Sequence, residues 1–328
     1  MSKLALSIAV GDYDRVRALV EGEVRIDGVC PAFLLLEPEE IFFRAFRHQE
    51  FDVCELSLSS FTVRASRGDN PYVGVPVFTS RAFRHTAITV RKDRIRSPRD
   101  LAGKRVGVPE WQLTACVWAR ALIEEYGVDL SDITWVRGGL EEAGRVEKIE
   151  LTLPEGIRLE DARGDRSLSQ MLEDGDLDGI VAPRVPSCQM RGSPHIGWLF
   201  DDTRAEAEAW YRRTGIFPIM HLLGVKKTLV ERHPWLPATV LKAFSHAKAR
   251  AVARLADTAA AKVTLPFVED QVLAARRLMG EDYWPYGVAP NRHVIEAFLT
   301  HHRRQGLSSG SLRPEDLFHP TTWESAKI

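Results

Sequence analysis

Short apolar runs rich in β-branched residues alternate with helix-like segments over most of the chain. The segments between the runs place apolar residues three and four positions apart, and several open with Ser, Thr, Asp or Pro, as helices do. Alternation of strand and helix is typical of an α/β sheet rather than of a sandwich. The charged, poorly periodic segment 141–166 is expected to be irregular. The predicted strands are residues 3–10, 24–26, 32–36, 51–56, 72–78, 86–90, 105–109, 133–136, 177–182 and 215–225.

The pattern also predicts two α/β lobes. The apolar runs near residues 86–92 and 219–226 are placed to cross from one lobe to the other. Residues 1–90 and 222–328 then form the first lobe, and residues 91–221 form the second. A ligand cleft is expected between such lobes, because domain interfaces are the usual place for small-molecule sites.

Composition places the chain among ordinary globular proteins. It has 328 residues, of which 45% are hydrophobic and 27% are charged, with a net charge of −1. This balance gives no general attraction to nucleic acid or to an acidic membrane, so any anion site must be local. The N-terminus lacks the order of a signal peptide, and no window approaches about 20 apolar residues. We therefore expect a cytoplasmic protein whose four cysteines are reduced core thiols.

Positive side chains gather just before one predicted strand. Arg81, Arg84 and His85 fall within five residues and lead into the β-branched run 86–90. A buried guanidinium needs a partner, and guanidinium binds carboxylate or phosphate in a bidentate fork. The segment is predicted to clamp an anionic ligand; a solvated basic turn bonded to local carboxylates is the alternative.

Three predicted strands hand over to helices at positions suited to anions. These positions contain Tyr13 and Arg15, Ser57, and Thr114, which is placed to cap the helix at 115–126. Free N–H groups and the positive end of the helix dipole attract anions there. Ordinary capping explains each position singly, and the coincidence of three favours a ligand site.

Two histidines and two glutamates are candidates for proton transfer. His221 stands alone in an apolar strand, where a satisfied core histidine is the alternative. Together with His85 it would give the site two groups that titrate near neutrality. Glu55 and Glu110 fall at strand ends, where they can orient an imidazole or accept a phenolic proton.

Other candidates follow from single residues. Arg184 is a further cation after a strand, and Trp111 and Tyr286 can flank a flat ring or belong to the core. Zinc spacings, a P-loop, a G-x-G-x-x-G fingerprint and a nucleophile elbow are absent from the sequence. No cofactor is therefore predicted. A divalent metal is compatible with the His and Glu side chains, but no spacing requires one.

Eight segments, in order along nearly the whole chain, resemble the 4,5-dihydroxyphthalate decarboxylase family. The GKRVG portion is generic to binding-protein folds, whereas RAFRH and PIMH are much more specific. The segments are YDR at 13–15, FDVCELS at 51–57, PVFTSRAFRH at 76–85, LAGKRVGVPEW at 101–111, TA at 114–115, TGIFPIMH at 214–221, HPW at 233–235 and WPYG at 284–287.

The resemblance implies a two-lobed, type 2 periplasmic-binding-protein-like fold, with mixed sheets flanked by helices and a ligand cleft between the lobes. It also implies a carboxy-lyase of aromatic catabolism (phthalate degradation) that converts 4,5-dihydroxyphthalate to protocatechuate and CO₂ by protonating a ring carbon. On this hypothesis Arg81 and Arg84 anchor carboxylates, His85 and His221 divide acid and base work, and Glu55 or Glu110 assists.

Two other interpretations remain open at this point. One is a cytosolic binding module or sensor of the same fold without catalysis, and the other is a lyase acting on a different aromatic or small carboxylate. In the enzymatic interpretation the partner is a small aromatic dicarboxylate, with no nucleic acid and no membrane. A homo-oligomer is compatible with the sequence.

Overall fold

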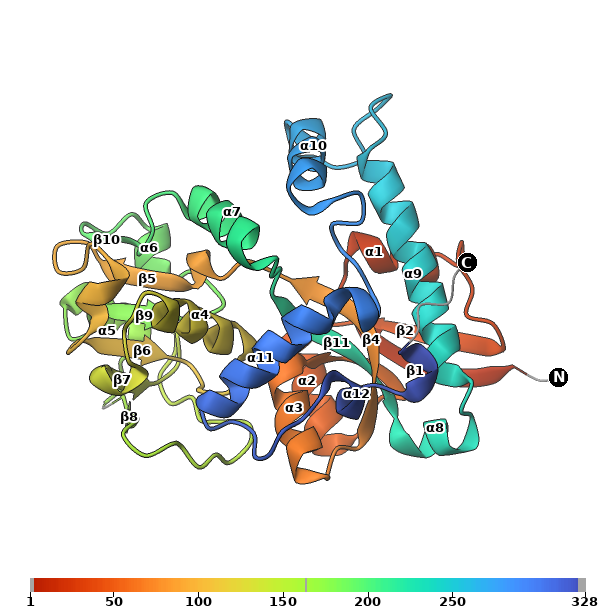
Figure 1. The fold of residues 1–328 in the computed structure, drawn as a ribbon, viewed down its shortest axis with the longest axis horizontal. Helices are drawn as coiled ribbons and strands as arrows, with labels where there is room; N and C mark the ends of the chain where they lie inside the picture. Colours follow the sequence, from red (N-terminus) through yellow and green to blue (C-terminus); the bar gives the residue numbers. More distant parts are fainter. Residues whose placement is uncertain (1–2, 163, 324–328) are drawn as a thin grey trace. The chain divides into compact units, whose positions relative to one another are not determined.

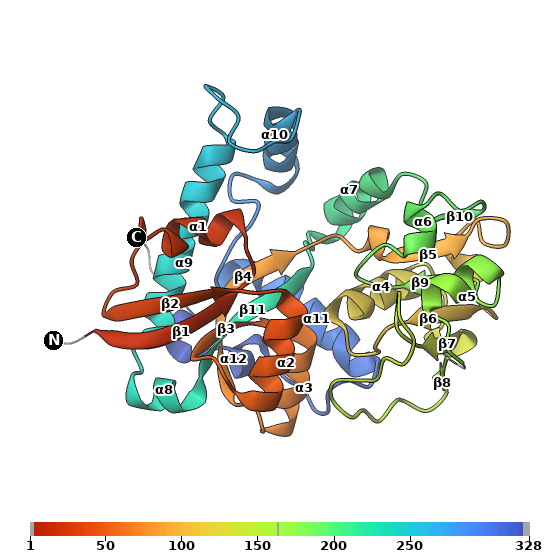
Figure 2. The ribbon, with the colours of Figure 1, turned by 180° about the vertical axis from the view of Figure 1, so that it is seen from behind.

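The chain forms two compact units in a computed structural model that describes residues 3–162 and 164–323. Within that range, unit 1 comprises residues 3–81, 219–296 and 311–323, and unit 2 comprises residues 82–218 and 297–310. Each unit contains one sheet flanked by helices (Figures 1 and 2). The predicted α/β class, with mixed sheets and flanking helices, is therefore confirmed.

The sheet of unit 1 has five strands in the order β2-β1-β3-β11-β4. β1 is parallel to β2 and β3, whereas β11 is antiparallel to its two neighbours β3 and β4. β3 is buried along its whole length and β11 along most of it, as expected of strands covered on both faces. The strands are β1 (Leu4–Val10), β2 (Val29–Leu35), β3 (Val53–Ser57), β4 (Tyr72–Arg81) and β11 (Ile219–Lys226).

Helices connect and cover this sheet. α2 begins with a proline in its first turn followed by two glutamates, a composition that suits a helix N-terminus, and it packs on β3. α9 packs on α1 and on β4 (Figure 1). The helices are α1 (Asp14–Val20), α2 (Pro38–His48), α3 (Leu58–Arg67), α8 (Lys227–Arg232), α9 (Leu236–Leu255), α10 (Val268–Met279) and α12 (Pro314–Leu317), with short 3₁₀ turns η4 (Ala289–Asn291) and η5 (Pro320–Thr322).

The sheet of unit 2 has six strands in the order β10-β5-β9-β6-β7-β8. β9, β6, β7 and β8 run parallel, and β5 is antiparallel to β9 and β10. The strands are β5 (Ile88–Arg91), β6 (Arg105–Val108), β7 (Thr134–Arg137), β8 (Arg158–Asp161), β9 (Gly179–Val181) and β10 (Ile196–Trp198).

The core of unit 2 lies between this sheet and its helices. α4 is buried along ten of its twelve residues, and an apolar cluster that includes Leu168, Leu172 and Ile180 packs α5 against the sheet. The helices are α4 (Thr114–Glu125), α5 (Leu168–Asp174), α6 (Ser187–Met190), α7 (Thr203–Thr214) and the end of α11 (Arg292–Arg304), with 3₁₀ turns η1 (His85–Ala87), η2 (Pro98–Leu101) and η3 (Leu130–Asp132).

The boundary between the units differs from the expected one. β5 pairs with β9 and β10, so the segment after Arg81 belongs to unit 2. β11 lies wholly in the sheet of unit 1. The C-terminal region is also divided, because Gln305 hydrogen-bonds Arg120 and Val117 of unit 2. Residues 297–310 therefore join unit 2 rather than the first lobe.

Four local predictions are wrong. Residues 24–26 form no strand, and residues 86–87 belong to the turn η1 that precedes β5. β8 forms inside the segment expected to be irregular, since it is a charged, mostly exposed edge strand that lacks apolar alternation. Cys54, Cys116 and Cys188 are buried free thiols as expected, but Cys30 is exposed because it lies on the edge strand β2.

Within the described ranges, no helix combines the length and apolarity that a bilayer crossing demands.

Candidate active site

The candidate site of unit 1 lies where its parallel strands end. β1 and β3 are parallel, and β4 runs with them because both β3 and β4 are antiparallel to β11. The carboxyl ends of these strands therefore meet at one edge of the sheet, and β11 begins at that edge. Ligands of open α/β sheets bind at such edges. The predicted residues Tyr13, Arg15, Glu55, Ser57 and His221 all lie there.

Glu55 is the centre of this arrangement. Its side chain is fully buried, and its carboxylate accepts hydrogen bonds from Gly11 N (2.9 Å), the Tyr13 hydroxyl (2.9 Å) and His221 Nδ1 (2.6 Å). Burial alone would raise the pKa of Glu55. The three hydrogen bonds and the charge of His221 outweigh that effect and hold the pKa below its ordinary value. Glu55 is therefore a carboxylate that accepts from three donors.

His221 is presented to the site by an irregularity in the sheet. Its pairing with β4 is shifted in register on both sides, and such bulges re-aim side chains. The imidazole is 18% exposed and packs edge-on against the Phe42 ring at 4.8 Å. Because Nδ1 donates to Glu55, the second ring nitrogen, Nε2, is the one left for proton exchange. Ser57 lies opposite His221 in β3 and caps α3 by accepting from Ser60 N.

Gly11 makes room for Tyr13. A Cβ atom at Gly11 would lie 2.5 Å from the Tyr13 ring, so only glycine allows this ring to fold back over the strand end. The same residue donates its N–H to Glu55. Burial, and then the charge of Glu55, raises the pKa of Tyr13, so its hydroxyl stays protonated and remains a donor.

Arg15 is a fixed, partly exposed cation beside this group. Its guanidinium lies 4.0 Å from the centroid of the Tyr13 ring and 4.7 Å from that of Trp284. Arg15 Nε donates to the carbonyl of Thr79 at 2.6 Å, and Nη1 pairs with Asp14 at 3.2 Å. The side chain is 16% exposed. A guanidinium held flat in this way is pre-organised for a carboxylate.

The loop 282–291 brings Trp284 and Tyr286 to unit 1's site. The buried Lys248 ammonium binds Asp282 (2.6 Å) and the carbonyl of Trp284 (3.1 Å). The indole N–H of Trp284 donates to the carbonyl of Phe78 at 2.8 Å. The loop is therefore fastened to α9 on one side and to β4 on the other.

Arg81 holds this loop and does not match its predicted role. It is only 6% exposed, and its guanidinium donates to Asn291 Oδ1 and to the carbonyl of Pro285. Asn291 in turn donates to the carbonyls of Pro285 and Gly287. Arg81 therefore acts as a structural tie within unit 1, which corrects its assignment as a substrate anchor.

His85 and Arg84 lie in unit 2, and His85 is shielded from water. His85 is 1% exposed, its ring packs against Phe200 and Trp210, and neither ring nitrogen hydrogen-bonds another group among the described residues. Burial, helped by the charge of Arg213, lowers the pKa of His85 to about 4. Arg84 is half-buried, and burial lowers the pKa of its guanidinium to about 10. A histidine that is neutral at pH 7 does not suit the acid part of the predicted division of acid and base work between His85 and His221.

Glu110 is engaged by cations of unit 2. It is 1% exposed and pairs with Arg145 (2.7 Å) and Lys148 (3.1 Å). The structure does not pair it with an imidazole, so the alternative in which Glu110 orients a histidine is not supported. Its partners come from the segment that was expected to be irregular.

The remaining predicted residues of unit 2 divide between core and surface. Trp111 is fully buried: its indole N–H donates to the carbonyl of Gln305, and Arg120 covers its ring at 3.7 Å. This arrangement contradicts a ring-flanking role, because no face of the indole is open to a ligand. Thr114 is buried in the first turn of α4 and does not cap it, whereas Arg184 is exposed after β9.

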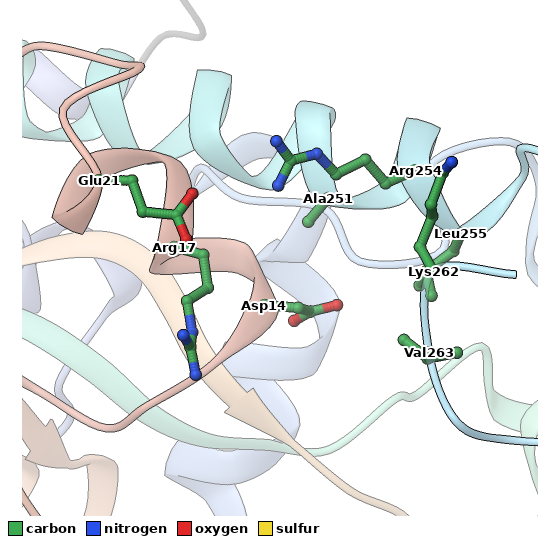
Figure 3. Close-up of a pocket in the computed structure, with 8 residues that line it drawn as sticks. All are labelled: Asp14, Arg17, Glu21, Ala251, Arg254, Leu255, Lys262 and Val263. Atoms are coloured by element: carbon green, nitrogen blue, oxygen red, sulfur yellow. The ribbon is translucent and has the colours of Figure 1, made fainter.

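A pocket of unit 1 lies beside α1 but differs from the candidate site in character. It has a volume of about 560 Å³ and is lined by Asp14, Arg17 and Glu21 together with residues of α9 and of the segment after it (Figure 3). Its cations are already paired: Arg17 with Asp12, Arg254 with Glu23, and Lys262 with Asp257. It therefore offers little to an anionic ligand.

Among residues 3–162 and 164–323, no group of three or more His, Cys, Asp or Glu side chains is arranged to hold a metal ion.

Sequence reasoning missed three residues that shape the site. Gly11 follows a predicted strand directly, and a glycine at that position is a recognisable sign of close backbone approach. Trp284 stands in the WPYG segment, but nothing in its neighbourhood indicates that its ring would meet Arg15. Lys248 falls on the apolar face of a long helix, where a buried charge has no sequence signal.

The chain is similar to two curated proteins over most or all of its length. It is 59% identical over 330 residues to 4,5-dihydroxyphthalate decarboxylase of Comamonas testosteroni, covering 100% of both chains. It is 58% identical over 214 residues to 4,5-dihydroxyphthalate decarboxylase of Pseudomonas putida, covering 65% of this chain and 83% of that protein. Residues 61–147 also match a family described as NMT1/THI5 like.

Solved structures share the fold at low sequence identity. The periplasmic aliphatic sulphonate binding protein of Escherichia coli has a TM-score of 0.54 at 16% identity and covers 100% of this chain and 96% of its own. An alkanesulfonate-binding protein of Xanthomonas axonopodis has a TM-score of 0.52 at 13% identity, with 99% and 100% covered. A Candida albicans protein described as having the generic periplasmic binding protein fold has a TM-score of 0.55 at 11% identity, with 98% of each chain covered. The fold is periplasmic-binding-protein-like, as the sequence predicts.

Proposed function

This chain belongs to the 4,5-dihydroxyphthalate decarboxylase family, and we propose that it converts 4,5-dihydroxyphthalate to protocatechuate and CO₂. It is a carboxy-lyase whose substrate is a small aromatic dicarboxylate. Family membership supports the substrate. The observation that carries the chemistry is the buried Glu55 carboxylate, 2.6 Å from Nδ1 of the partly exposed His221.

The reaction exchanges a carboxylate for a proton at one ring carbon. A hydroxyl para to that carbon, once deprotonated, donates charge into the ring. The ring carbon takes up a proton and loses its aromaticity. The bond to the carboxylate then breaks, CO₂ leaves, and the electron pair of that bond restores the aromatic ring. The protein must therefore hold a spectator carboxylate, accept the phenolic proton, deliver a proton to the ring carbon and keep the departing carboxylate poorly solvated.

His221 is suited to take the phenolic proton. With Nδ1–H donated to Glu55, the neutral imidazole has Nε2 as its basic nitrogen. The imidazolium that forms is stabilised by the carboxylate directly behind it, as in other pairs of a histidine and a buried acid. Tyr13 and Gly11 hold that carboxylate in place. This assignment revises the predicted division of acid and base work between His85 and His221.

Arg15 is suited to anchor the spectator carboxylate. Its guanidinium is held in place by two aromatic rings, by the carbonyl of Thr79 and by Asp14, and the side chain is 16% exposed. It replaces Arg81 in this role, because Arg81 is committed to the loop 282–291. No metal or other cofactor takes part in the proposal, and turnover is expected to survive dialysis against EDTA. The cytoplasmic location and the homo-oligomer stay predictions from the sequence.

Incubation of the purified protein with 4,5-dihydroxyphthalate tests the proposal. Chromatography and a CO₂ assay are expected to detect protocatechuate and CO₂ in equal amounts. A ligand-induced rise in melting temperature without product would contradict the proposal and favour a binding module or sensor. Turnover of another aromatic acid in place of 4,5-dihydroxyphthalate would favour a different lyase.

A further inference from the structure

The hydroxyl of Tyr286 has no hydrogen-bond partner in the part of the chain that the structure describes. The residue is 8% exposed, and its oxygen is buried. Buried side-chain polar atoms almost always have a partner, and an orphan in a native structure calls for an explanation. Leaving a phenol oxygen unsatisfied in the free protein is unfavourable unless another molecule completes the bond.

The backbone on both sides of Tyr286 is held in place by other parts of unit 1. The carbonyl of Pro285 is held by Arg81 and Asn291, and Gly287 N donates to the carbonyl of Pro76 at 2.8 Å. Lys248 Nζ lies 5.3 Å from the centroid of the Tyr286 ring. The residues on both sides of Tyr286 are therefore fixed, and its ring is covered by a cation.

The charges around Tyr286 indicate what would bind there. Burial raises the pKa of Tyr286, so the hydroxyl remains a donor at neutral pH; the positive charges of Arg15 and Arg81 lower this pKa, and the negative charges of Glu55 and Asp14 raise it. An unused O–H donor binds a negatively charged oxygen more strongly than a neutral one, and the partly exposed Arg15 adds a positive charge that favours such an oxygen. A neutral carbonyl would use this donor but would gain nothing from the charge of Arg15.

We propose that the Tyr286 hydroxyl donates a hydrogen bond to an anionic oxygen of the bound aromatic dicarboxylate and so helps to determine substrate specificity. The inference rests on the proposed function, because it takes its ligand from that reaction. The anionic oxygen belongs either to a carboxylate or to the phenolate formed when the substrate loses its proton. Both sources present the same chemistry to the tyrosine.

The test compares two Tyr→Phe variants in the full-length protein. Tyr286→Phe removes the unpaired hydroxyl, whereas Tyr72→Phe removes a buried hydroxyl that donates to the carbonyl of Phe51 at 3.0 Å. Tyr286→Phe is expected to keep or raise the melting temperature of the free protein and to lower kcat/KM by about 10- to 100-fold. Tyr72→Phe is expected to lower the melting temperature and to leave kcat/KM within about twofold.

Phthalate, which has the carboxylates but no hydroxyls, separates the two oxygen sources. If Tyr286 binds a carboxylate, Tyr286→Phe weakens inhibition by phthalate as much as it weakens substrate binding. If Tyr286 binds the phenolate, inhibition by phthalate is unchanged. An unchanged kcat/KM, or a loss of melting temperature equal to that of Tyr72→Phe, would overturn the proposal.

Failure of the proposed function would be recognised separately. In that case the wild-type protein makes no protocatechuate, and the melting-temperature shift given by 4,5-dihydroxyphthalate becomes the readout. A shift that is smaller in Tyr286→Phe than in wild type supports the role of the hydroxyl. A shift that is equal in both, or absent, overturns it.

Discussion

Two buried glutamates, one in each unit, occupy similar places but have different surroundings. Glu55 lies in β3 and Glu110 follows β6, and both are almost completely shielded from water. Glu55 accepts from a backbone N–H, a tyrosine and a histidine. Glu110 pairs with an arginine and a lysine, whose charges are permanent near neutral pH.

The difference shows that the partners of a buried carboxylate decide what it can do. A histidine gains and loses a proton near neutrality, so the Glu55 site can accept a proton and be stabilised when it does. Arginine and lysine stay protonated near neutral pH, so the ion pairs of Glu110 serve a structural role. Glu110 fastens the segment that follows β7 to the end of β6.

Replacing His221, the histidine that pairs with Glu55, should have the largest effect on activity. His221→Asn is expected to lower kcat by about 10²- to 10⁴-fold, because it removes the proposed base. His301→Asn is a matched control: His301 is 16% exposed and lies 3.7 Å from Glu124, against 18% and 2.6 Å for His221 and Glu55. Normal turnover by His221→Asn, measured as protocatechuate formed, would contradict the assignment.

Neutralising each glutamate should give opposite results. Glu55→Gln is expected to lower kcat by about 10- to 100-fold. One of the two accepting oxygens becomes an N–H₂ donor, so Gly11 N–H and His221 Nδ1–H can no longer both find an acceptor, and the imidazole also loses the negative charge behind it. Glu110→Gln is expected to keep kcat and to lower the free energy of unfolding by roughly 1–3 kcal/mol, since Arg145 and Lys148 lose their partner. Initial rates and urea denaturation of both variants check this. An equal loss of activity in Glu55→Gln and Glu110→Gln would contradict the different roles assigned to the two glutamates.

A methyl group at Gly11 should disturb the contact between Tyr13 and Glu55 without changing a charge. Gly11→Ala places a Cβ 2.5 Å from the Tyr13 ring, so Tyr13 must move away from Glu55. Overpacking of this kind lowers the free energy of unfolding by about 1–3 kcal/mol, and we also expect roughly a tenfold loss of kcat/KM. Gly197→Ala, where the nearest atom lies 3.6 Å away, should leave both quantities unchanged.

The last prediction concerns stability rather than activity, through His85, a buried group of unit 2 that has no hydrogen-bond partner among the described residues. Its folded pKa of about 4 lies below the ordinary value of about 6.5, so between these two pH values the unfolded chain binds more protons. Its contribution to stability is therefore complete above about pH 6.5 and is lost as the pH falls toward 4. His85→Phe should reduce the fall in the free energy of unfolding between pH 6.5 and 4 by roughly 2–3 kcal/mol. Urea denaturation at several pH values measures this. If the free energy of unfolding changes with pH in His85→Phe as it does in wild type, the prediction is incorrect.

Much of the fold was predictable because strand and helix leave clear periodic signals. The strand ends that carry Tyr13, Glu55 and Arg81 were placed close to their observed positions, and the α/β class follows from the alternation. The pairing of Glu55 with His221 was not predictable, because it depends on the register of β11 between β3 and β4 and on an irregularity in that register.

Partners contributed by poorly patterned segments explain the remaining errors. Glu110 was a candidate like Glu55 because Arg145 and Lys148 come from a stretch without periodicity. Arg81 was assigned to the substrate because its acceptors, Pro285 and Asn291, are neutral groups some 200 positions later. A sequence shows where a charge lies, but only the folded chain shows whether another part of the molecule already neutralises or binds it.

The position of β11 has a consequence for the order in which the protein is made. β11 lies between β3 and β4 in the sheet but is synthesised only after most of unit 2. On the ribosome, β4 therefore has no neighbouring strand in that sheet until residue 226 has emerged. Long-range strand pairing of this kind is slow. Because the strand that completes the sheet also carries His221, a nascent chain acquires the Glu55–His221 pair only when the sheet is complete, and shorter chains should be inactive.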